Sequence, residues 1–548
     1  MIDVKISAKC GKLMKYGVIA VLVVLCTLGV GQSELFTRSW FIQGISTPVY
    51  ACSFIAAFLV HLCFWLGIYL MSVSSRIVAY VLFPIIAIVQ ILVYYASSRY
   101  GAVCEELAVA VYNASWGQVI NYLNFRSFVW AVISLSFPFC CMYGLRRFIF
   151  PEGIKQFRRF FLAGSGLCLL SFMLPVFVFN CVRPVAIQAV RCYIEREPWR
   201  LAFPIKRSEE EACLAILQEK DEKQSRLYEA AYIPIWNTCV FFHSLYKFHF
   251  PAELIRSDSI SSCVNQKAVP NIVVFYIGES FRADHNPMNG YCRNTLPNIS
   301  LMSNIINLPY LHCCETQTIS SIYSFLVLKD ENTGEPQYTS FLDILIKHGY
   351  KAFLMVGMNS GTWYNTPMIA PLFDGRMSIF SRPSHYTDYP EGIKILRDAH
   401  HNPLFVMIED GAGHMPYNSS TYPFGTATVI DRFDNAMVDI DMTVTAVIES
   451  IKEEEAILFF TSDHGESFGE NGRWGHGGPK TAKEQLHVTG FIWYSDSYAD
   501  KYPDVVRHLK ENAEKFTSLD YAYHTIISMC GISSELQIPS QDMTRPQE

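Results

Sequence analysis

Charged residues are scarce in this chain of 548 residues, where they make up 17% and give a net charge of −6. The sequence lacks a basic stripe with interleaved aromatic side chains, which argues against nucleic-acid binding. It also lacks a CxxC pair among its 17 cysteines, which argues against a zinc ribbon. Internal repeats and low-complexity tracts are absent as well, so nothing indicates a repeat array.

The chain contains long apolar runs with few charged residues, and these runs lie within residues 1–183. Crossing a bilayer takes about 20 apolar residues, and five runs approach or exceed that length. They are residues 16–31, 49–72, 77–96, 128–145 and 160–181. The first lacks a small-residue cleavage site, which favours a retained helix over a signal peptide. Lysine and arginine fall on one side of this five-span arrangement, and the positive-inside rule assigns that side to the cytoplasm.

Three parts follow from this pattern. Residues 1–183 are predicted to form a five-helix transmembrane domain, residues 184–264 a helical connector, and residues 265–548 an α/β domain outside the membrane. The aromatic, lightly charged stretch 235–249 indicates a helix at the membrane interface, with a buried core helix as the alternative. In a Gram-negative cell the outer domain would be periplasmic.

The predicted outer domain alternates strand-like and helix-like patterns. Apolar runs predict strands at residues 272–277, 352–357, 404–408, 456–461 and 491–494. Helical periodicity predicts helices at residues 319–328, 340–348, 428–452 and 518–530. Apolar runs separated by helices indicate a mostly parallel sheet with helices on both faces.

Polar side chains follow three of the predicted strands. They are Glu279, Glu409, His414, Asp463 and His464. A further histidine, His476, follows a glycine-rich loop that can fold back toward the same place. Ligands of such sheets bind beyond the carboxyl ends of the strands, where Asp and His are typical ligands of a divalent metal. A polar surface turn is the alternative interpretation.

The segment CETQTISS (314–321) brings several hydroxyl groups to the start of a predicted helix. Backbone N–H groups and the helix dipole favour an anion at such a position. A hydroxyl there, beside a metal, can ionise and attack phosphorus or sulfur. An ordinary helix cap with a Ser/Thr-rich first turn is the alternative.

Four segments carry a resemblance to a known family. They are GESFRADHNPMNGYCRNTLPNIS (278–300), CETQT (314–318), GHMPY (413–417) and SDHGESFGENGRWGHGG (462–478). Together they resemble the lipid A and lipopolysaccharide phosphoethanolamine transferases, an inner-membrane branch of the alkaline phosphatase and sulfatase superfamily. The resemblance implies five membrane spans followed by a periplasmic, alkaline-phosphatase-like catalytic domain.

The resemblance also implies a set of site residues. Thr318 would be the catalytic nucleophile that takes up the phosphoethanolamine group. The implied ligands of one zinc ion are Glu279, Thr318, Asp463 and His464. The residues implied for the substrate or a second zinc ion are His414, His476, Arg282 and Glu409. For Arg282, an ordinary salt bridge is an equal alternative.

Three positions depart from the family pattern. Ser324 stands where a second cysteine would close a disulfide around the nucleophile. The family's lysine near the phosphoryl site is missing from the corresponding segment 358–363, and Glu409 replaces a histidine. These changes leave the metal ligands intact and affect recognition of the head group or the acceptor.

The resemblance predicts a zinc-dependent enzyme that moves phosphoethanolamine from phosphatidylethanolamine to a lipopolysaccharide acceptor, through a phosphothreonine intermediate. The acceptor would be a lipid A phosphate or a core sugar. The resemblance links the addition of phosphoethanolamine to lipid A with polymyxin resistance. We expect a monomeric, multi-pass inner-membrane protein. The alternatives are a glycerophosphate transferase of the lipoteichoic acid synthase kind and an inactive membrane scaffold. A sulfatase is disfavoured because no CxPxR or SxPxR sequence is present to form a formylglycine.

Overall fold

Two compact units make up the chain, Met1–Ser244 and Leu245–Glu548. The computed structural model describes residues 47–90, 157–177, 236–251, 253–264, 269–329, 336–357, 363–381, 383, 385–417, 419–470, 474–477 and 482–546. The predicted domain boundaries after residues 183 and 264 stay predictions.

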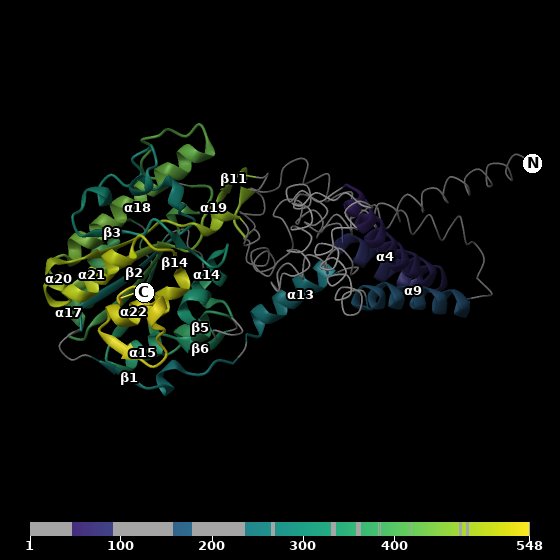
Figure 1. Ribbon diagram of the computed structural model, residues 1–548, viewed down its shortest axis with the longest axis horizontal. Helices are drawn as coiled ribbons and strands as arrows, with labels where there is room; N and C mark the ends of the chain where they lie inside the picture. Colours follow the sequence, from purple (N-terminus) through teal and green to yellow (C-terminus); the bar gives the residue numbers. More distant parts are fainter. Residues whose placement is uncertain are drawn as a thin grey trace, which may run out of the picture. The chain divides into compact units, whose positions relative to one another are not determined.

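In the first unit, helix α4 (Thr47–Ser74) packs along helix α9 (Phe157–Phe177) (Figure 1). The π-helical turn η1 (Val78–Leu82) follows α4. Two glycines let the backbones of α4 and α9 approach, since a Cβ on Gly164 would lie 2.6 Å from the carbonyl oxygen of Gly67. Larger residues at these two positions would therefore push the helices apart.

The predicted membrane spans are matched only in part by these helices. Runs 16–31 and 128–145 lie outside the described residues. Helices α4 and α9 cover most of runs 49–72 and 160–181, and helical turns cover residues 78–90. Among the described residues, no helix has both the length and the apolar character needed to cross a membrane. The five predicted spans are therefore not confirmed.

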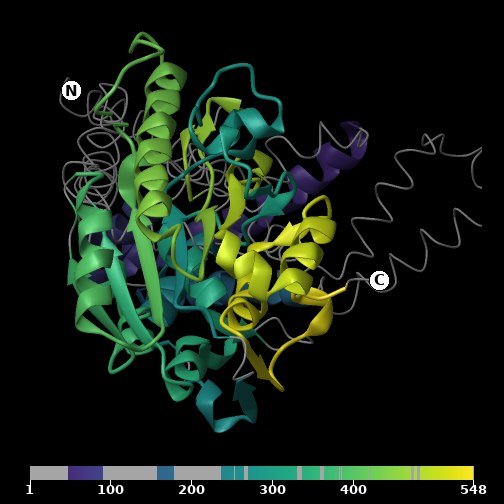
Figure 2. The same cartoon turned by 90° about the vertical axis from the view of Figure 1, so that its left-hand side faces the viewer.

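The second unit, shown in two views in Figures 1 and 2, is built on a sheet. This sheet has seven strands in the order β3-β13-β10-β2-β9-β7-β8. Its parallel strands are β2 (Ile272–Gly278), β7 (Lys351–Val356), β8 (Met377–Ser381), β9 (Leu404–Asp410) and β10 (Ala456–Ser462). At one edge β13 (Gly490–Tyr494) pairs antiparallel with β10, and β3 (Ile305–Asn307) pairs antiparallel with β13. The predicted mostly parallel sheet is thus confirmed.

Helices cover both faces of this sheet. On one face, α17 (Asp388–Ala399) and α18 (Val429–Ile451) share a core with Ile272, Val274 and Tyr276 of β2. On the other face, the ring of Phe325 on α14 (Thr318–Leu326) lies 5.3 Å from that of Phe275. Also on that face are α15 (Leu342–Lys347) and α22 (Ala522–Met529).

Helix α18 begins where its sequence dictates. The Thr428 side chain accepts a hydrogen bond from the backbone of Asp431, whose carboxylate accepts one from the backbone of Thr428. This capping box satisfies two backbone N–H groups at the helix start. The prediction of a helix over residues 428–452 is confirmed, because cap and apolar periodicity agree.

Short elements complete the described chain. They are α13 (Trp236–His249), β1 (Ser262–Val264), β4 (Leu311–His312), β5 (Val327–Lys329), β6 (Pro336–Ser340), α16 (Ala370–Phe373), β11 (Ser467–Phe468), β12 (Trp474–Gly475), α19 (Lys483–Leu486), α20 (Asp496–Lys501), α21 (Pro503–Asn512), β14 (Thr517–Ser518) and β15 (Ile532–Ser534). Three-residue 3₁₀ turns include η12 (Leu519–Tyr521), directly before α22. Helix α13 forms where residues 235–249 predict a helix, and its place at a membrane interface stays a prediction.

Candidate active site

The site lies where three parallel strands end side by side. Strand β2 is flanked by β9 and β10, and Gly278 pairs with Asp410 on one side and Ser462 on the other. Glu279 and Asp463 follow β2 and β10 directly, and both are buried. The backbone turns sharply at Ser280, whose φ of 66° lies in the left-handed region. The strand register therefore brings the predicted ligands together.

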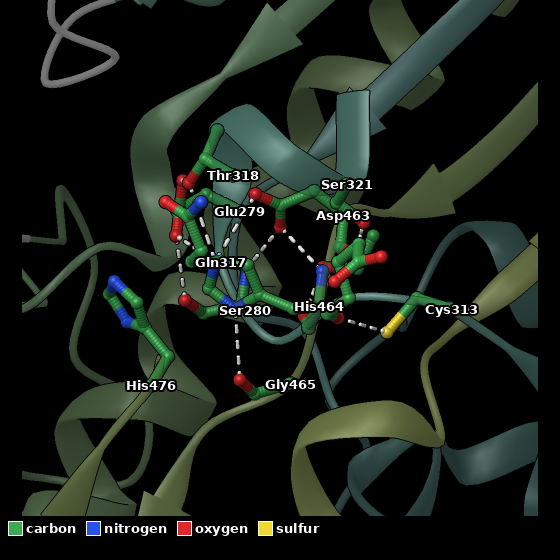
Figure 3. Close-up of polar contacts among 12 residues, drawn as sticks. Glu279, Ser280, Cys313, Gln317, Thr318, Ser321, Asp463, His464, Gly465 and His476 are labelled. Carbon is green, nitrogen blue, oxygen red and sulfur yellow. Dashed lines mark hydrogen bonds and ion pairs between the residues drawn. The ribbon is translucent and has the colours of Figure 1, made fainter. Parts of the chain in front are cut away.

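Thr318 faces these carboxylates from the first turn of α14 (Figure 3). Its hydroxyl donates a hydrogen bond to Glu279 Oε2 at 3.0 Å, and His464 Nε2 lies 3.3 Å from the same hydroxyl. Ser321, one turn further along, donates to the backbone carbonyl of Asp463 at 2.5 Å. The start of α14 is thus tied directly to the end of β10.

His464 presents one ring nitrogen to the cluster. Its Nδ1 lies 2.9 Å from the carbonyl oxygen of Gly465, which can only accept, so Nδ1 carries the proton. Its Nε2 then bears the lone pair and lies 3.3 Å from Glu279 Oε1 and 3.3 Å from Asp463 Oδ2. A backbone carbonyl that fixes the tautomer in this way is typical of a histidine that binds a metal.

The two buried carboxylates are electrostatically opposed. Burial alone would raise the pKa of Glu279, but the attraction of its carboxylate to the protonated forms of His464, His414 and His476 outweighs burial and lowers that pKa to about 2. For Asp463, burial and then the negative charge of Glu279 raise the pKa well above its usual range. A bound cation would remove this conflict, because it attracts both carboxylates at once.

The residues fit a metal ion. Glu279, Asp463 and His464 each offer a ligand atom, and these atoms all lie within 4.8 Å of one another. Asp463 Oδ2 is buried and accepts no hydrogen bond from the residues that the structure describes. A buried carboxylate oxygen without a donor is costly, and a metal ion would compensate it. The donor set of two carboxylates and an imidazole is one that zinc accepts.

A second group surrounds the other side of Glu279. Ligand atoms of Glu279, His414 and His476 also lie within 4.8 Å of one another. The rings of His464 and His476 are 4.4 Å apart, and those of His414 and His476 are 5.7 Å apart. His476 Nδ1 lies 3.3 Å from Glu466 Oε2. The structure therefore brings together the predicted metal residues and both predicted histidines.

The guanidinium of Arg282 forms its contacts with other residues of the same unit. Its guanidinium donates to Asp284 at 2.7 Å and to Glu470 at 2.6 Å, and also to the carbonyl of Glu466. It also lies over the ring of Phe468, at 4.9 Å from the centroid. These contacts favour the salt-bridge interpretation of Arg282 over direct contact with a phosphate.

Glu409 is buried at the end of β9 and accepts a hydrogen bond from the indole N–H of Trp363 at 2.8 Å. Neither Glu409 nor Arg282 belongs to the ligand groups found among the described residues. Both Trp363 and Glu409 lie at positions where the sequence departs from the family pattern. The two side chains that differ from the family pattern are thus hydrogen-bonded to each other.

Asp434 on α18 is a residue that sequence reasoning missed. It accepts hydrogen bonds from His285 Nδ1 at 2.7 Å, from the Tyr291 hydroxyl at 2.9 Å and from Arg293 at 2.7 Å. These partners belong to the segment 278–300 that carries the family resemblance. These three residues therefore attach the segment to α18, and an acidic residue on the buried face of that helix was the available signal.

Residues 270–532 match the family model described as Sulfatase. This stretch, just under half of the chain, is similar to sulfatase-family domains. The chain is similar to the Kdo(2)-lipid A phosphoethanolamine 7''-transferase of Salmonella typhimurium, with 26% identity over 296 residues, or 48% of this chain and 52% of that protein. It is also similar to the phosphatidylethanolamine transferase Mcr-2 of Escherichia coli, with 26% identity over 279 residues, or 44% and 52% of the two chains. The chain spans about half the length of these curated relatives.

A solved structure shares the fold over nearly the whole chain. The integral membrane lipooligosaccharide phosphoethanolamine transferase A from Neisseria meningitidis aligns with a TM-score of 0.67 and 17% identity. The alignment covers 96% of this chain and 99% of that one. This structure shows the shared fold, and the Sulfatase match and the curated relatives confirm the predicted resemblance to phosphoethanolamine transferases of the alkaline phosphatase superfamily.

Proposed function

We propose that this protein transfers phosphoethanolamine from phosphatidylethanolamine to a lipopolysaccharide acceptor, through a phosphothreonine formed on Thr318. The observation that carries the proposal is the position of the Thr318 hydroxyl, 3.0 Å from Glu279 and 3.3 Å from His464 inside the ligand cluster. A hydroxyl at a helix start, facing metal-type ligands, is placed as a nucleophile would be. The names of the curated relatives, which are phosphoethanolamine and phosphatidylethanolamine transferases, supply the transferred group.

Zinc is the metal that this donor set suits. The residues that would hold it are Glu279, Thr318, Asp463 and His464. Bound zinc acts as a Lewis acid and favours the ionised form of a hydroxyl at neutral pH. His414 and His476 would bind the phosphoryl oxygens or a second zinc ion.

The chain's own groups account for each step of the transfer. The Thr318 hydroxyl, oriented by its hydrogen bond to Glu279, gives up its proton as its oxygen attacks phosphorus, the bond from phosphorus to the diacylglycerol oxygen breaks, and that oxygen leaves as the hydroxyl of diacylglycerol after gaining a proton. Backbone N–H groups of the first turn of α14 favour the anionic phosphoryl group now on Thr318. An acceptor oxygen then attacks the same phosphorus, and the Thr318 oxygen leaves.

Lipid substrates explain why such a domain would be anchored. The donor is a membrane phospholipid, and the proposed acceptor is a glycolipid, either at a lipid A phosphate or at a core sugar. Holding the domain at the membrane raises the effective concentration of both. We therefore propose that the protein lies in the inner membrane with its catalytic domain in the periplasm, and its monomeric state stays a prediction.

The covalent intermediate gives the direct test. Purified full-length protein, incubated with phosphatidylethanolamine and zinc, should gain the mass of one phosphoethanolamine group on the peptide that contains Thr318. Thr318→Ala should lose this adduct and the transfer to lipid A, whereas the matched variant Ser320→Ala, in the same helical turn, should keep both. Transfer that survives in Thr318→Ala would refute the proposed nucleophile, and mass spectrometry of lipid A and core oligosaccharide identifies the acceptor.

A further inference from the structure

A polar cluster lies at the other end of the helix that carries Thr318. Ser324 donates a hydrogen bond to Asp520 Oδ1 at 2.7 Å. Lys329, in β5, lies 3.2 Å from the same carboxylate oxygen and donates to Ser324 Oγ at 2.5 Å. We call these three residues the α14 clamp. The clamp joins α14 and the strand that follows it to η12, which lies about 200 residues further along the chain.

The segment before Thr318 is held by the same part of the chain. Strand β14 (Thr517–Ser518) pairs with β4 (Leu311–His312), and Cys314 Sγ lies 3.1 Å from Ser518 Oγ. Burial, and then the negative charge of Asp520, raise the pKa of the Cys314 thiol to about 12. The nucleophile is therefore flanked on both sides by residues that contact the stretch 517–520.

These contacts matter because α14 is a short helix, so a movement at its Ser324 end also moves Thr318 at its start. Thr318 and Ser324 are six residues apart, which is about 9 Å along a helix. Ser324 is 4% exposed, so without Asp520 its hydroxyl would be buried with one partner fewer. A small tilt or rotation of α14 would move the Thr318 hydroxyl away from Glu279, and a misplacement of about 1 Å can cost about 100-fold in rate.

We propose that Asp520 is a positioning residue of the transfer reaction, which fixes α14 through Ser324 and Lys329 and thereby aims the Thr318 hydroxyl at the ligand cluster. This proposal rests on the proposed role of Thr318. The clamp uses no disulfide, since the described cysteines, Cys313 and Cys314 included, are free thiols. The position of the Thr318 hydroxyl should accordingly not depend on a disulfide bond in this part of the chain.

The kinetic test compares two substitutions at one partly exposed position. The Asp520 side chain is 33% exposed, so Asp520→Asn and Asp520→Glu should both fold. Asp520→Asn should lower kcat by about 10-fold or more and leave KM within about 2-fold, because the substrate contacts are intact while the nucleophile is misplaced. Asp520→Glu keeps the charge and should retain kcat within about 3-fold of wild type. Ser324→Ala, which removes the other half of the contact, should repeat the loss seen in Asp520→Asn.

Controls separate positioning from general stability. Asp504→Asn, at an 82% exposed carboxylate that pairs with Arg507 on α21, should behave as wild type. Tris(2-carboxyethyl)phosphine should leave the kcat of wild-type protein unchanged. Wild-type kcat in both Asp520→Asn and Ser324→Ala, equal changes in kcat for Asp520→Asn and Asp504→Asn, or a loss of kcat on reduction would overturn the proposal.

A readout independent of transfer keeps this test distinct from the proposed function. Hydrogen exchange followed by mass spectrometry should show faster exchange in peptides covering residues 314–329 of Asp520→Asn than of Asp504→Asn. If wild-type protein shows no Thr318-dependent transfer, the proposed function fails while the exchange result still decides whether Asp520 holds α14. Unchanged exchange in that segment would refute the clamp even in an active enzyme.

Discussion

Removing the Asp434 carboxylate should strongly destabilise the second unit. Asp434 is fully buried on α18 and holds the segment after Glu279 through His285, Tyr291 and Arg293. Asp434→Ala would delete all three hydrogen bonds and leave the buried ring of His285 without its partner on α18. The segment after Glu279 would then be held to that helix by its remaining contacts, which include the hydrogen bonds from Asn298 and Ile299 to Asp441.

The size of the effect follows from the exposure of each partner. The His285 side chain is 8% exposed, and its hydrogen bond to a charged group contributes about 1.5–3 kcal/mol. The bond from Tyr291 is of the same kind and adds a similar amount. The Arg293 side chain is 33% exposed, so solvent screening limits its contribution to about 1 kcal/mol or less. We expect Asp434→Ala to lower the free energy of unfolding by about 3–7 kcal/mol, the sum of these three contributions, whose lower part matches the usual cost of removing one partner from a buried charged network.

Proteolysis at rising urea concentrations, applied to the purified full-length chain, measures this change in the second unit. Asp434→Asn retains part of the hydrogen bonding and should lose about half as much. The matched control is Glu449→Gln on the same helix, where a 54% exposed carboxylate pairs with Lys452 and its loss should cost about 0.5 kcal/mol or less. Equal effects of Asp434→Ala and Glu449→Gln would refute the reasoning.

Two further predictions concern pH and metal. Burial lowers the pKa of His524 to about 4. Between pH 6.5 and 4, His524 is therefore protonated in the unfolded chain but neutral in the folded chain. The free energy of unfolding should fall by up to about 3 kcal/mol as the pH drops through this window, and urea unfolding of His524→Gln at several pH values should show a flatter profile. Zinc at about 100 times its Kd should stabilise chelator-treated protein by about 2.7 kcal/mol. Thermal unfolding should show a smaller gain in Glu279→Gln, and an equal gain would contradict the assignment of Glu279 as a ligand.

The central strands could be predicted because complete burial leaves a direct mark on a sequence. All seven residues of each of β2, β9 and β10 are buried, and each strand begins with a continuous apolar run of at least five residues. Strands β3 and β8 were not predicted. They are short edge strands, and their formation depends on pairing with β13 and β7. The local sequence of an edge strand carries little of that information.

The kinds of ligand were likewise determined by the sequence, since polar residues that follow buried strands must gather at one edge of a parallel sheet. The tertiary structure decided which hydrogen-bond partner each of these side chains has. Trp363 meets Glu409 across 46 residues of chain, and Ser324 meets Asp520 across 196. Contacts between residues so far apart have no periodic signature, because they arise only when separate elements pack together. The sequence by itself thus determined the chemistry available at the site, and the packing of α14, β9 and η12 decided how that chemistry is held in place.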